Sequence, residues 1–318
     1  MPTVMNVNEC GTAPLVSVIT ITRNRASLLP RAIKSVLGQT YKNIEYIILD
    51  GASTDDTEEV VKKYSDDKRL VYHRFDRNYP IVETLNIGFN QSHGDYITFL
   101  DDDDEYLPTK IEKQVNLFST LDAQYGMVYC WMSYFDSATN KFIKLHNPKV
   151  RGMVADEVVE RPLVSGTPTM MFRRSTFSSL GGWRDDMGIV SDWELAARCC
   201  QKWKVDYVPE SLIKIYVNHG YLRMTCTTFN KDKYFATIKF HLLFLQEFSE
   251  IFDRYPIKKR YHYKNLIRIY IDLKEWKSAF TYYGKLWKIE PTMKNILFSF
   301  YLLARSLSYS LKIKKTVS

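Results

Sequence analysis

The chain of 318 residues contains few residues able to cross-link a protein and has no long apolar run. Its five cysteines, none in a Cys-x-x-Cys pair, are Cys10, Cys130, Cys199, Cys200 and Cys226. This spacing indicates neither a zinc knuckle nor a disulfide framework, so we expect a reducing compartment. No apolar run approaches the roughly 20 residues that span a bilayer, and the first residues lack the basic-then-apolar pattern of a signal peptide. We therefore expect a cytoplasmic protein.

Two common phosphate-binding motifs are also missing. The chain has no Gly-x-x-x-x-Gly-Lys-Ser/Thr loop and no Gly-x-Gly-x-x-Gly loop, so it carries neither a P-loop nor a dinucleotide-binding fingerprint. Only 13 residues are glycine, whereas 45% of the residues are hydrophobic and 22 are tyrosine. This composition is typical of a folded globular protein and excludes the disordered and fibrous classes.

Charge is unevenly distributed along the chain. Residues 227–318 hold 18 Lys and Arg against 7 Asp and Glu, a net charge of +11, whereas residues 1–226 hold 26 against 29, a net charge of −3. The basic region has no base-reading motif, so we expect no nucleic-acid partner and favour an anionic membrane surface. Residues 292–315 combine an apolar stretch with basic residues, which is the pattern of an interfacial helix. We therefore expect a peripheral contact with the inner face of the cytoplasmic membrane, with packing on neighbouring helices as the alternative.

Apolar strand patterns alternate with amphipathic helix patterns in the first part of the chain. The apolar runs that predict strands lie at 16–22, 44–50, 70–74 and 96–100, and the helical patterns between them lie at 28–37, 53–63 and 81–92. This alternation predicts an α/β fold with a mostly parallel sheet flanked by helices. Ser27 precedes the first helix, where we expect it to act as the N-cap.

The patterns in the later part of the chain complete a division of the whole sequence into three regions. Helical patterns at 109–122 and 192–202 and extended segments at 127–132, 163–174 and 205–217 continue the α/β region, and the pattern is helical from 231 onward. We expect a flexible N-terminal lead over 1–14, a catalytic α/β domain over 15–226 and a basic α-helical C-terminal extension over 227–318.

Four consecutive aspartates, Asp101–Asp104, follow the apolar strand pattern at 96–100. Adjacent carboxylates repel one another and cannot all be buried without partners. A divalent cation such as Mg²⁺ or Mn²⁺ suits carboxylate oxygens and often binds together with substrate phosphates. A solvated acidic turn is the alternative. In a parallel sheet ligands bind beyond the carboxyl ends of the strands, so Thr22, Asp50 and Asp101 are expected at one edge.

Several segments of this chain resemble family 2 glycosyltransferases and occur in that family's order. They are Val16–Arg25, Ala32–Tyr41, Asp50–Thr57, Asn86–Gly88 and Gly94–Ile97 followed by Asp101–Asp104. The resemblance covers about residues 15–220 and implies the GT-A fold, a Rossmann-like architecture. It also implies an inverting, metal-dependent enzyme of the kind used in bacterial polysaccharide and cell-envelope biosynthesis. The implied donor is a nucleoside diphosphate sugar, with UDP-type favoured, and the acceptor is a hydroxyl of a glycan or of a lipid-linked molecule.

The same resemblance implies roles for residues at the strand ends. Thr22 and Arg25 would line the nucleotide, and Asp50 would accept a hydrogen bond from its base. Asp103 is the first choice as a direct ligand of Mn²⁺ or Mg²⁺, while Asp101 would contact the ribose or the water shell of the metal. His219 follows a strand-like run, where related enzymes often place a histidine near the metal or diphosphate.

A second group of residues resembles the acceptor region of the family. Asp192 is the candidate catalytic base, because a carboxylate there would take the proton from an acceptor hydroxyl. Ser191 replaces the glutamate that usually precedes this aspartate. Trp193, Glu194 and Arg198 follow in the same segment. Glu194 and Arg198 are four residues apart, so a structural salt bridge on one helix face is an equal alternative to a ligand role.

Two other functional classes stay open from the sequence. A nucleotidyltransferase uses a related sheet, although its usual Gly-rich, Lys-bearing phosphate loop is absent after the first strand. A non-catalytic module that binds sugar nucleotides is the other alternative, which the presence of Asp101, Asp103 and Asp192 disfavours. Turnover of a donor with metal separates the enzymes from the module, and the released product separates the two enzymes.

Overall fold

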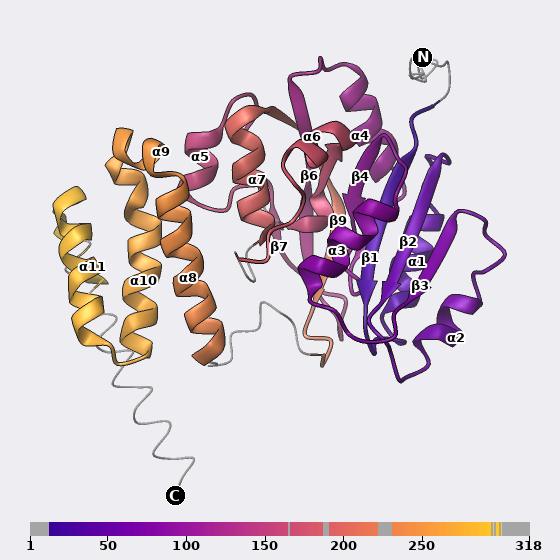
Figure 1. Ribbon diagram of the computed structural model, residues 1–318, viewed down its shortest axis with the longest axis horizontal. Helices are drawn as coiled ribbons and strands as arrows, with labels where there is room; N and C mark the ends of the chain where they lie inside the picture. The colour runs from indigo at the N-terminus through magenta and orange to yellow at the C-terminus, as the bar shows by residue number, and fades with distance from the viewer. Residues whose placement is uncertain are drawn as a thin grey trace, which may run out of the picture. The chain divides into compact units, whose positions relative to one another are not determined.

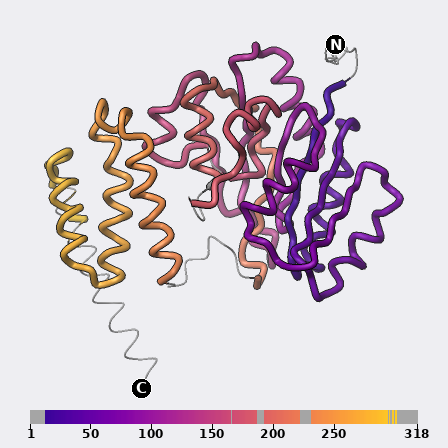
Figure 2. Tube along the Cα trace, viewed as in Figure 1, coloured from indigo at the N-terminus to yellow at the C-terminus, as the bar shows by residue number. Residues whose placement is uncertain are grey.

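A computed structural model describes residues 13–164, 166–186, 191–221 and 231–293, together with residues 295, 297, 298 and 300. The described residues form two compact units. The first holds residues up to 158 together with 163–185 and 191–221, and the second holds 159–162 and the helices that begin at 231. Figures 1 and 2 follow the chain from the sheet of the first unit, in indigo to magenta, to these helices, in orange to yellow.

The first half of the sheet is parallel. Strand β1 lies between β2 and β4, and β3 lies beyond β2, so that all four carboxyl ends point to one edge. The strands are β1 (Val16–Thr22), β2 (Ile44–Asp50), β3 (Leu70–Arg74) and β4 (Tyr96–Phe99). The helices that connect them are α1 (Leu29–Leu37), α2 (Thr57–Lys62) and α3 (Ile81–Gln91).

The second half of the sheet is mixed. Among the described residues the nine strands form one sheet in the order β3-β2-β1-β4-β8-β6-β9-β5, with β7 paired to β6. Strand β8 is antiparallel to both β4 and β6, whereas β9 is parallel to β6. The strands are β5 (Glu105–Tyr106), β6 (Tyr125–Asp136), β7 (Phe142–His146), β8 (Met170–Arg173) and β9 (Lys204–Val217). The helices are α4 (Lys110–Ser119), α5 (Ala155–Glu160), the 3₁₀ helix η1 (Thr167–Thr169), α6 (Arg174–Ser179) and α7 (Ser191–Lys202).

The predicted α/β class, with a helix-flanked sheet and a helical C-terminal region, is confirmed. The expectation for 163–174 is only partly right, because the strand there is limited to Met170–Arg173 and a 3₁₀ helix precedes it. The expectation for Ser27 is wrong. Helix α1 begins after Leu28 with no side-chain cap, and the Ser27 hydroxyl instead lies 2.8 Å from the hydroxyl of Tyr221.

Close packing of helix α3 on the parallel strands explains one glycine of the sequence pattern. A Cβ atom at Gly88 would lie 2.7 Å from Cδ1 of Leu49 and 2.8 Å from Cγ2 of Ile19. Both neighbours are buried in the sheet, and tightly packed interiors have little room to move. Glycine at this position therefore lets α3 approach β1 and β2, which keeps the strand ends in register.

The second unit is a set of packed helices. They are α8 (Lys231–Glu247), α9 (Ser249–Arg254), a 3₁₀ helix (Pro256–Lys259), α10 (Arg260–Asp272) and α11 (Trp276–Ile289). Leu266, Ile267 and Leu286 are buried where these helices meet. In the part of the chain that the structure describes, no helix is long and apolar enough to cross a membrane. The interfacial helix predicted over 292–315 lies mostly outside the described residues, as do residues 1–12 of the predicted lead, and both stay predictions.

Two buried histidines form the polar centre of this helical unit. The Nδ1 atoms of His241 and His262 are 3.0 Å apart, and Nε2 of His262 lies 2.9 Å from the carbonyl oxygen of Val159. Because Nε2 of His262 donates to this carbonyl, its Nδ1 accepts a hydrogen bond from His241 in the neutral pair. Burial lowers the pKa of His262 to about 4, and burial together with the charge of His262 lowers the pKa of His241.

We predict that acid destabilises the helical unit through this pair. The unfolded chain binds protons at these histidines near the ordinary pKa of about 6.5, whereas the folded chain resists protonation. The contribution of the pair is therefore fully present above that pKa and is lost progressively as the pH falls from about 6.5 toward 4. Thermal unfolding between pH 7.5 and 5 measures this loss. A double variant, His241→Leu with His262→Leu, should show a weaker pH dependence, and an unchanged dependence would contradict the assignment.

Candidate functional site

The carboxyl ends of β1, β2 and β4 meet at one edge of the sheet. Thr22 and Asp50 end their strands side by side in the parallel register. The backbone N–H of Leu100, just after β4, donates to the carbonyl of Ile19 at 3.0 Å. The four aspartates begin at the next residue. The topology therefore brings the strand-end residues to one edge, as the sequence predicts for a parallel sheet.

Three carboxylates converge in this acidic cluster, which we define as Asp101–Asp104. Asp101, Asp103 and Asp104 each present an oxygen, and these oxygens all lie within 4.8 Å of one another. Asp101 is exposed, whereas Asp102, Asp103 and Asp104 are buried, with Asp104 fully covered. Oxygen ligands at this spacing suit a hard divalent cation. The residues present therefore fit the metal that the sequence predicts.

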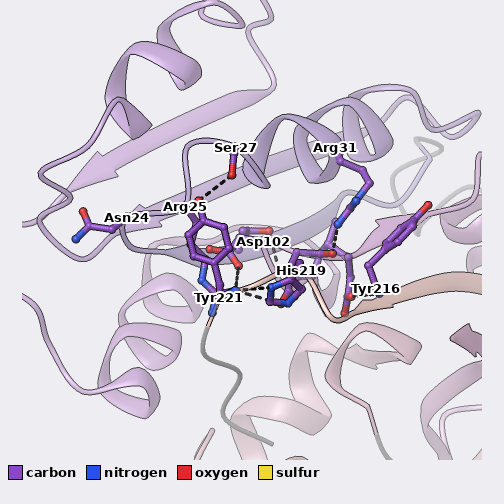
Figure 3. A network of polar contacts seen from close by, with 12 residues as sticks. Asn24, Arg25, Ser27, Arg31, Asp102, Tyr216, His219 and Tyr221 are labelled. Carbon is purple, nitrogen blue, oxygen red and sulfur yellow. Dashed lines mark hydrogen bonds and ion pairs between the residues drawn. The ribbon is translucent and has the colours of Figure 1, made fainter. Parts of the chain in front are cut away.

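Two side chains approach the cluster from two directions (Figure 3). Nη1 of Arg25, from the loop after β1, lies 3.1 Å from both Oδ1 of Asp102 and Oδ2 of Asp103. Nε2 of His219, just beyond β9, lies 2.9 Å from the same Oδ2 of Asp103. Burial raises the pKa of Asp102 to about 6, although the charge of Arg25 and a hydrogen bond from it oppose this rise. Buried carboxylates of this kind need such partners to remain charged.

Tyr221 links the end of β9 to the loop after β1. Its backbone N–H donates to Nδ1 of His219 at 3.3 Å, so the neutral imidazole carries its proton on Nε2, the nitrogen that lies 2.9 Å from Oδ2 of Asp103. Its hydroxyl lies 2.8 Å from that of Ser27, and its ring centroid is 5.8 Å from the guanidinium carbon of Arg25. Figure 3 shows Tyr221 and Arg25 side by side next to His219. The sequence carries no signal for this role of Tyr221.

The backbone of the cluster is held by α1 and β9. Nη2 of Arg31 donates to the carbonyl of Asp103, and the guanidinium carbon lies 3.7 Å from the ring centroid of Tyr216. The backbone N–H of Tyr216 donates to Oδ1 of Asp104 at 3.2 Å, and its hydroxyl donates to Glu105 at 2.7 Å. Arg31 and Tyr216 therefore fix the position of the cluster, and sequence reasoning missed both.

Asp50 is fully buried and already accepts several hydrogen bonds. Its Oδ1 accepts from the backbone N–H of Ser53 at 2.8 Å and from its hydroxyl at 2.6 Å, and its Oδ2 accepts from the hydroxyl of Tyr72 at 2.5 Å. Thr22 beside it is only 5% exposed. A carboxylate offers about four lone-pair sites, so the predicted hydrogen bond from a nucleotide base uses the remaining capacity of Asp50. These nucleotide roles stay predictions.

Asp192 lies in the first turn of α7 and is only partly exposed. Its Oδ2 accepts from the backbone N–H of Gly166 at 2.8 Å, and its Oδ1 accepts from the backbone N–H of Trp193 at 2.8 Å. Burial raises the pKa of Asp192, and these backbone hydrogen bonds oppose the rise. A carboxylate with a raised pKa is better suited to accept a proton near neutral pH. The structure thus gathers Arg25, Asp101, Asp103 and His219 at the strand ends.

The other three residues predicted for the acceptor region make internal contacts. Trp193 is 2% exposed, and its Nε1 donates to the carbonyl of Val158 at 2.6 Å. Glu194 is fully buried and receives a bidentate pair from Arg198, at 2.7 Å from Nε and 2.8 Å from Nη2. Nη2 of Arg198 also donates to the carbonyl of Gly182 at 3.0 Å. The salt bridge that the four-residue spacing allows is therefore formed, and it ties α7 to the preceding loop.

Comparison with known proteins assigns the chain to a family. Residues 17–181, more than half of the chain, match the family described as Glycosyl transferase family 2. The chain belongs to glycosyl transferase family 2. An uncharacterized glycosyltransferase of Rickettsia typhi is 30% identical over 210 residues, which cover 65% of each protein. This family 2 chain thus spans less than two thirds of that relative. The putative colanic acid biosynthesis glycosyl transferase WcaA of Escherichia coli is 26% identical over 84% of this chain and 92% of its own length.

Solved structures show the same fold for this family 2 chain. TarS of S. aureus, crystallised with UDP-GlcNAc, superposes with a TM-score of 0.65 at 14% identity, covering 86% of this chain and 81% of that one. The mannosyltransferase PcManGT from Pyrobaculum calidifontis, in complex with GDP-Man and Mn²⁺, gives a TM-score of 0.54 at 17% identity over 94% and 81% of the two chains. The predicted GT-A architecture is thereby confirmed.

We predict that Arg198 of this family 2 chain is structural. Among the described residues, Arg198→Met would leave Arg184, whose Nη1 is 3.6 Å away, as the remaining ion-pair partner of the buried Glu194 carboxylate. Breaking a buried pair in this way typically lowers the free energy of unfolding by about 3–5 kcal/mol. Denaturant unfolding measures the loss. Lys62→Met, which removes the exposed pairs with Glu58 and Glu59, is the control and should leave the midpoint nearly unchanged. A loss no larger than that of the control would show that the pair is not structural.

Proposed function

We propose that the protein is a metal-dependent, inverting glycosyltransferase. It would move a sugar from a nucleoside diphosphate sugar to a hydroxyl of a glycan or lipid-linked acceptor. The observation that carries this proposal is the convergence of three carboxylate oxygens at the strand ends of a family 2 chain. Two structural neighbours are described with UDP-GlcNAc and with GDP-Man and Mn²⁺, which supports a nucleotide-sugar donor. We favour a UDP-type donor.

Asp103 and Asp101 would hold the Mn²⁺ or Mg²⁺, with Asp104 as a third oxygen donor and His219 beside them. When bound, the cation neutralises the diphosphate and stabilises it as a leaving group. Arg25 forms an ion pair with Asp103, and Nε2 of His219 lies beside the same carboxylate oxygen. The side chain of Arg25 is 20% exposed, so it can also contact the phosphates of a donor. Asp101 is exposed and would contact the ribose.

Asp192 would act as the base of a single displacement. The acceptor hydroxyl oxygen forms a bond to the anomeric carbon of the sugar, and the bond from that carbon to the diphosphate oxygen breaks. The hydroxyl proton passes to Asp192, and the nucleoside diphosphate leaves with the electron pair of the broken bond. One displacement inverts the anomeric centre. Gly166 and Trp193 each use one hydrogen bond to Asp192, so each oxygen keeps a lone pair for the proton.

The reaction products distinguish the proposed enzyme from a nucleotidyltransferase and from a non-catalytic module. A nucleotidyltransferase would join a nucleotide to its acceptor and release pyrophosphate, whereas the proposed enzyme releases a nucleoside diphosphate. A non-catalytic module would bind a donor without turnover. Incubation with UDP-GlcNAc, GDP-mannose and related donors in Mn²⁺, followed by chromatography of the nucleotides, distinguishes these outcomes. Release of UDP or GDP from one donor supports the proposal, and binding of a donor with no release in the presence of acceptor glycans contradicts it.

We predict that Asp103→Asn weakens metal-dependent nucleotide binding and leaves the fold intact. The amide keeps the size of the side chain but removes the charge that a divalent cation needs. Titration of UDP or GDP in saturating Mn²⁺ should show affinity reduced by roughly tenfold or more, as for the loss of a charged contact. Asp66→Asn, which alters an exposed surface carboxylate, is the matched control. Normal turnover of the Asp103 variant in Mn²⁺ would refute the metal role.

We predict that Asp192→Asn lowers transfer by roughly 10²–10⁴-fold, the range for loss of a general base. The amide is nearly isosteric but cannot take a proton, so donor affinity should be almost unchanged. Burial raises the pKa of Asp192, and only the ionised form acts as a base. The rate of the native enzyme should therefore fall with pH below a pKa that lies above the ordinary aspartate value of about 3.9. Parallel loss of donor affinity and rate in the variant would mark Asp192 as structural.

A further inference from the structure

A chain of buried hydrogen bonds leads from helix α4 to Asp192. Nε2 of Gln114, which is fully buried, donates to the carbonyl of Thr169 at 2.8 Å. The hydroxyl of Thr169 donates to the carbonyl of Gly166 at 2.8 Å, and its backbone N–H donates to the same carbonyl at 2.9 Å. The N–H of Gly166 then donates to Oδ2 of Asp192 at 2.8 Å. The carbonyl that Thr169 binds and the N–H that binds Asp192 therefore belong to the two peptide groups on either side of the Gly166 Cα.

Gly166 can make this contact because it has no side chain. Its backbone has φ 86 and ψ 96 at the start of the 3₁₀ helix η1, a conformation that residues with a Cβ rarely adopt. A Cβ here would also lie 2.9 Å from both Cε and Sδ of Met132. Because glycine is conformationally free, its own sterics do not fix the two peptide groups that flank it. The two hydrogen bonds from Thr169 restrain the group on the carbonyl side of Gly166.

The burial and the position of Thr169 allow it to restrain Gly166. It is 1% exposed and ends η1 immediately before strand β8. Because β8 is paired with β4 and β6, the backbone of Thr169 is anchored to the centre of the sheet. Gln114 anchors its carbonyl as well. The Gly166 carbonyl is therefore anchored to the sheet through Thr169, one Cα away from the N–H that binds Asp192.

We propose that Thr169 is a positioning residue for the catalytic base, because its hydroxyl restrains the carbonyl side of Gly166, the residue whose N–H holds the Asp192 carboxylate in one orientation. This inference rests on the proposed function of Asp192. Oδ1 is bound by the N–H of Trp193, within α7 itself. The Gly166 N–H binds the other oxygen from a different part of the chain. Rotation of the carboxylate would break at least one of these hydrogen bonds.

The hydrogen bond from Gly166 should affect the pKa of Asp192, which can be measured independently of catalysis. A hydrogen bond from Gly166 to the charged carboxylate favours ionisation, and this bond opposes the rise in the pKa of Asp192 that burial causes. The other charged side chains in this stretch of α7, Glu194 and Arg198, are paired with each other. If Gly166 loses the hydrogen bond from the Thr169 hydroxyl, its N–H should hold the carboxylate less well, and the pKa of Asp192 should rise further.

The test compares three threonine variants. Thr169→Val removes the hydroxyl and keeps the branched shape, whereas Thr169→Ser keeps the hydroxyl. Thr176→Val is the matched control, because Thr176 is fully buried in α6 and its hydroxyl makes no hydrogen bond within the described part of the chain. The first measurement is the pH titration of the Asp192 carboxyl carbon by NMR in protein labelled with ¹³C-aspartate. The signal is assigned by its absence in Asp192→Asn.

We expect Thr169→Val to raise the pKa of Asp192, and Thr169→Ser and Thr176→Val to leave it unchanged. In nucleotide release from UDP-GlcNAc or GDP-mannose, whichever is turned over, kcat of Thr169→Val should fall by about tenfold or more, since correct orientation governs proton transfer. The KM for the donor should not change. The acid limb of kcat should move to higher pH in this variant alone.

Each outcome decides the proposal. If Thr169→Val titrates like Thr176→Val, the positioning role is refuted, whatever the role of Asp192. If Asp192→Asn turns over normally, the proposed base is wrong, while the titration still reports whether Thr169 orients the carboxylate. Thr169→Ala serves if the valine variant does not fold, with the same expected rise. A fall in kcat equal in Thr169→Val and Thr176→Val would reflect a general packing effect and would also overturn the inference.

Discussion

The neutralisation of adjacent carboxylates at one edge of the sheet is the constraint on which the rest of the site depends. Three of the four aspartates after β4 are buried, and buried carboxylates without partners are strongly unfavourable. Arg25 from the loop after β1 and His219 from beyond β9 supply the compensating groups. The acidic cluster is therefore stable only when the first and last strands of the α/β unit are both in place. Folding and site assembly are thus coupled through charge.

This arrangement also leaves the cluster poised for a cation. Arg25 and His219 share a single oxygen of Asp103, while Asp101 remains exposed. A divalent ion would add positive charge where oxygens of Asp101, Asp103 and Asp104 converge, and hard oxygen ligands favour such ions. The surroundings of Asp192 are built differently. Asp192 is held by backbone N–H groups rather than by cations, so it keeps the capacity to take a proton that an ion pair would suppress.

The sequence predicts the parallel half of this fold closely and the site only in part. The bounds of β1 and β2 follow from apolar runs that end in Thr22 and Asp50, because buried parallel strands have continuous apolar patterns. The two-residue strand β5 is too short for a pattern, and the exposed β7 has no buried face to mark it. Contacts such as that between Ser27 and Tyr221, 194 residues apart, depend on the position of β9 in the sheet. Local patterns do not encode strand order, so these partners become visible only in the structure.

We expect the acidic cluster to bind a nucleoside diphosphate together with a divalent cation. The most direct measurement is the thermal unfolding midpoint of the protein with UDP, GDP or other nucleoside diphosphates, each with Mn²⁺ and with a chelator. A ligand that binds only the folded state raises this midpoint. At least one nucleoside diphosphate should raise the unfolding midpoint in Mn²⁺, and this rise should disappear when the chelator replaces the metal. An equal rise in the chelator, or no rise with any nucleotide in Mn²⁺, would contradict this expectation.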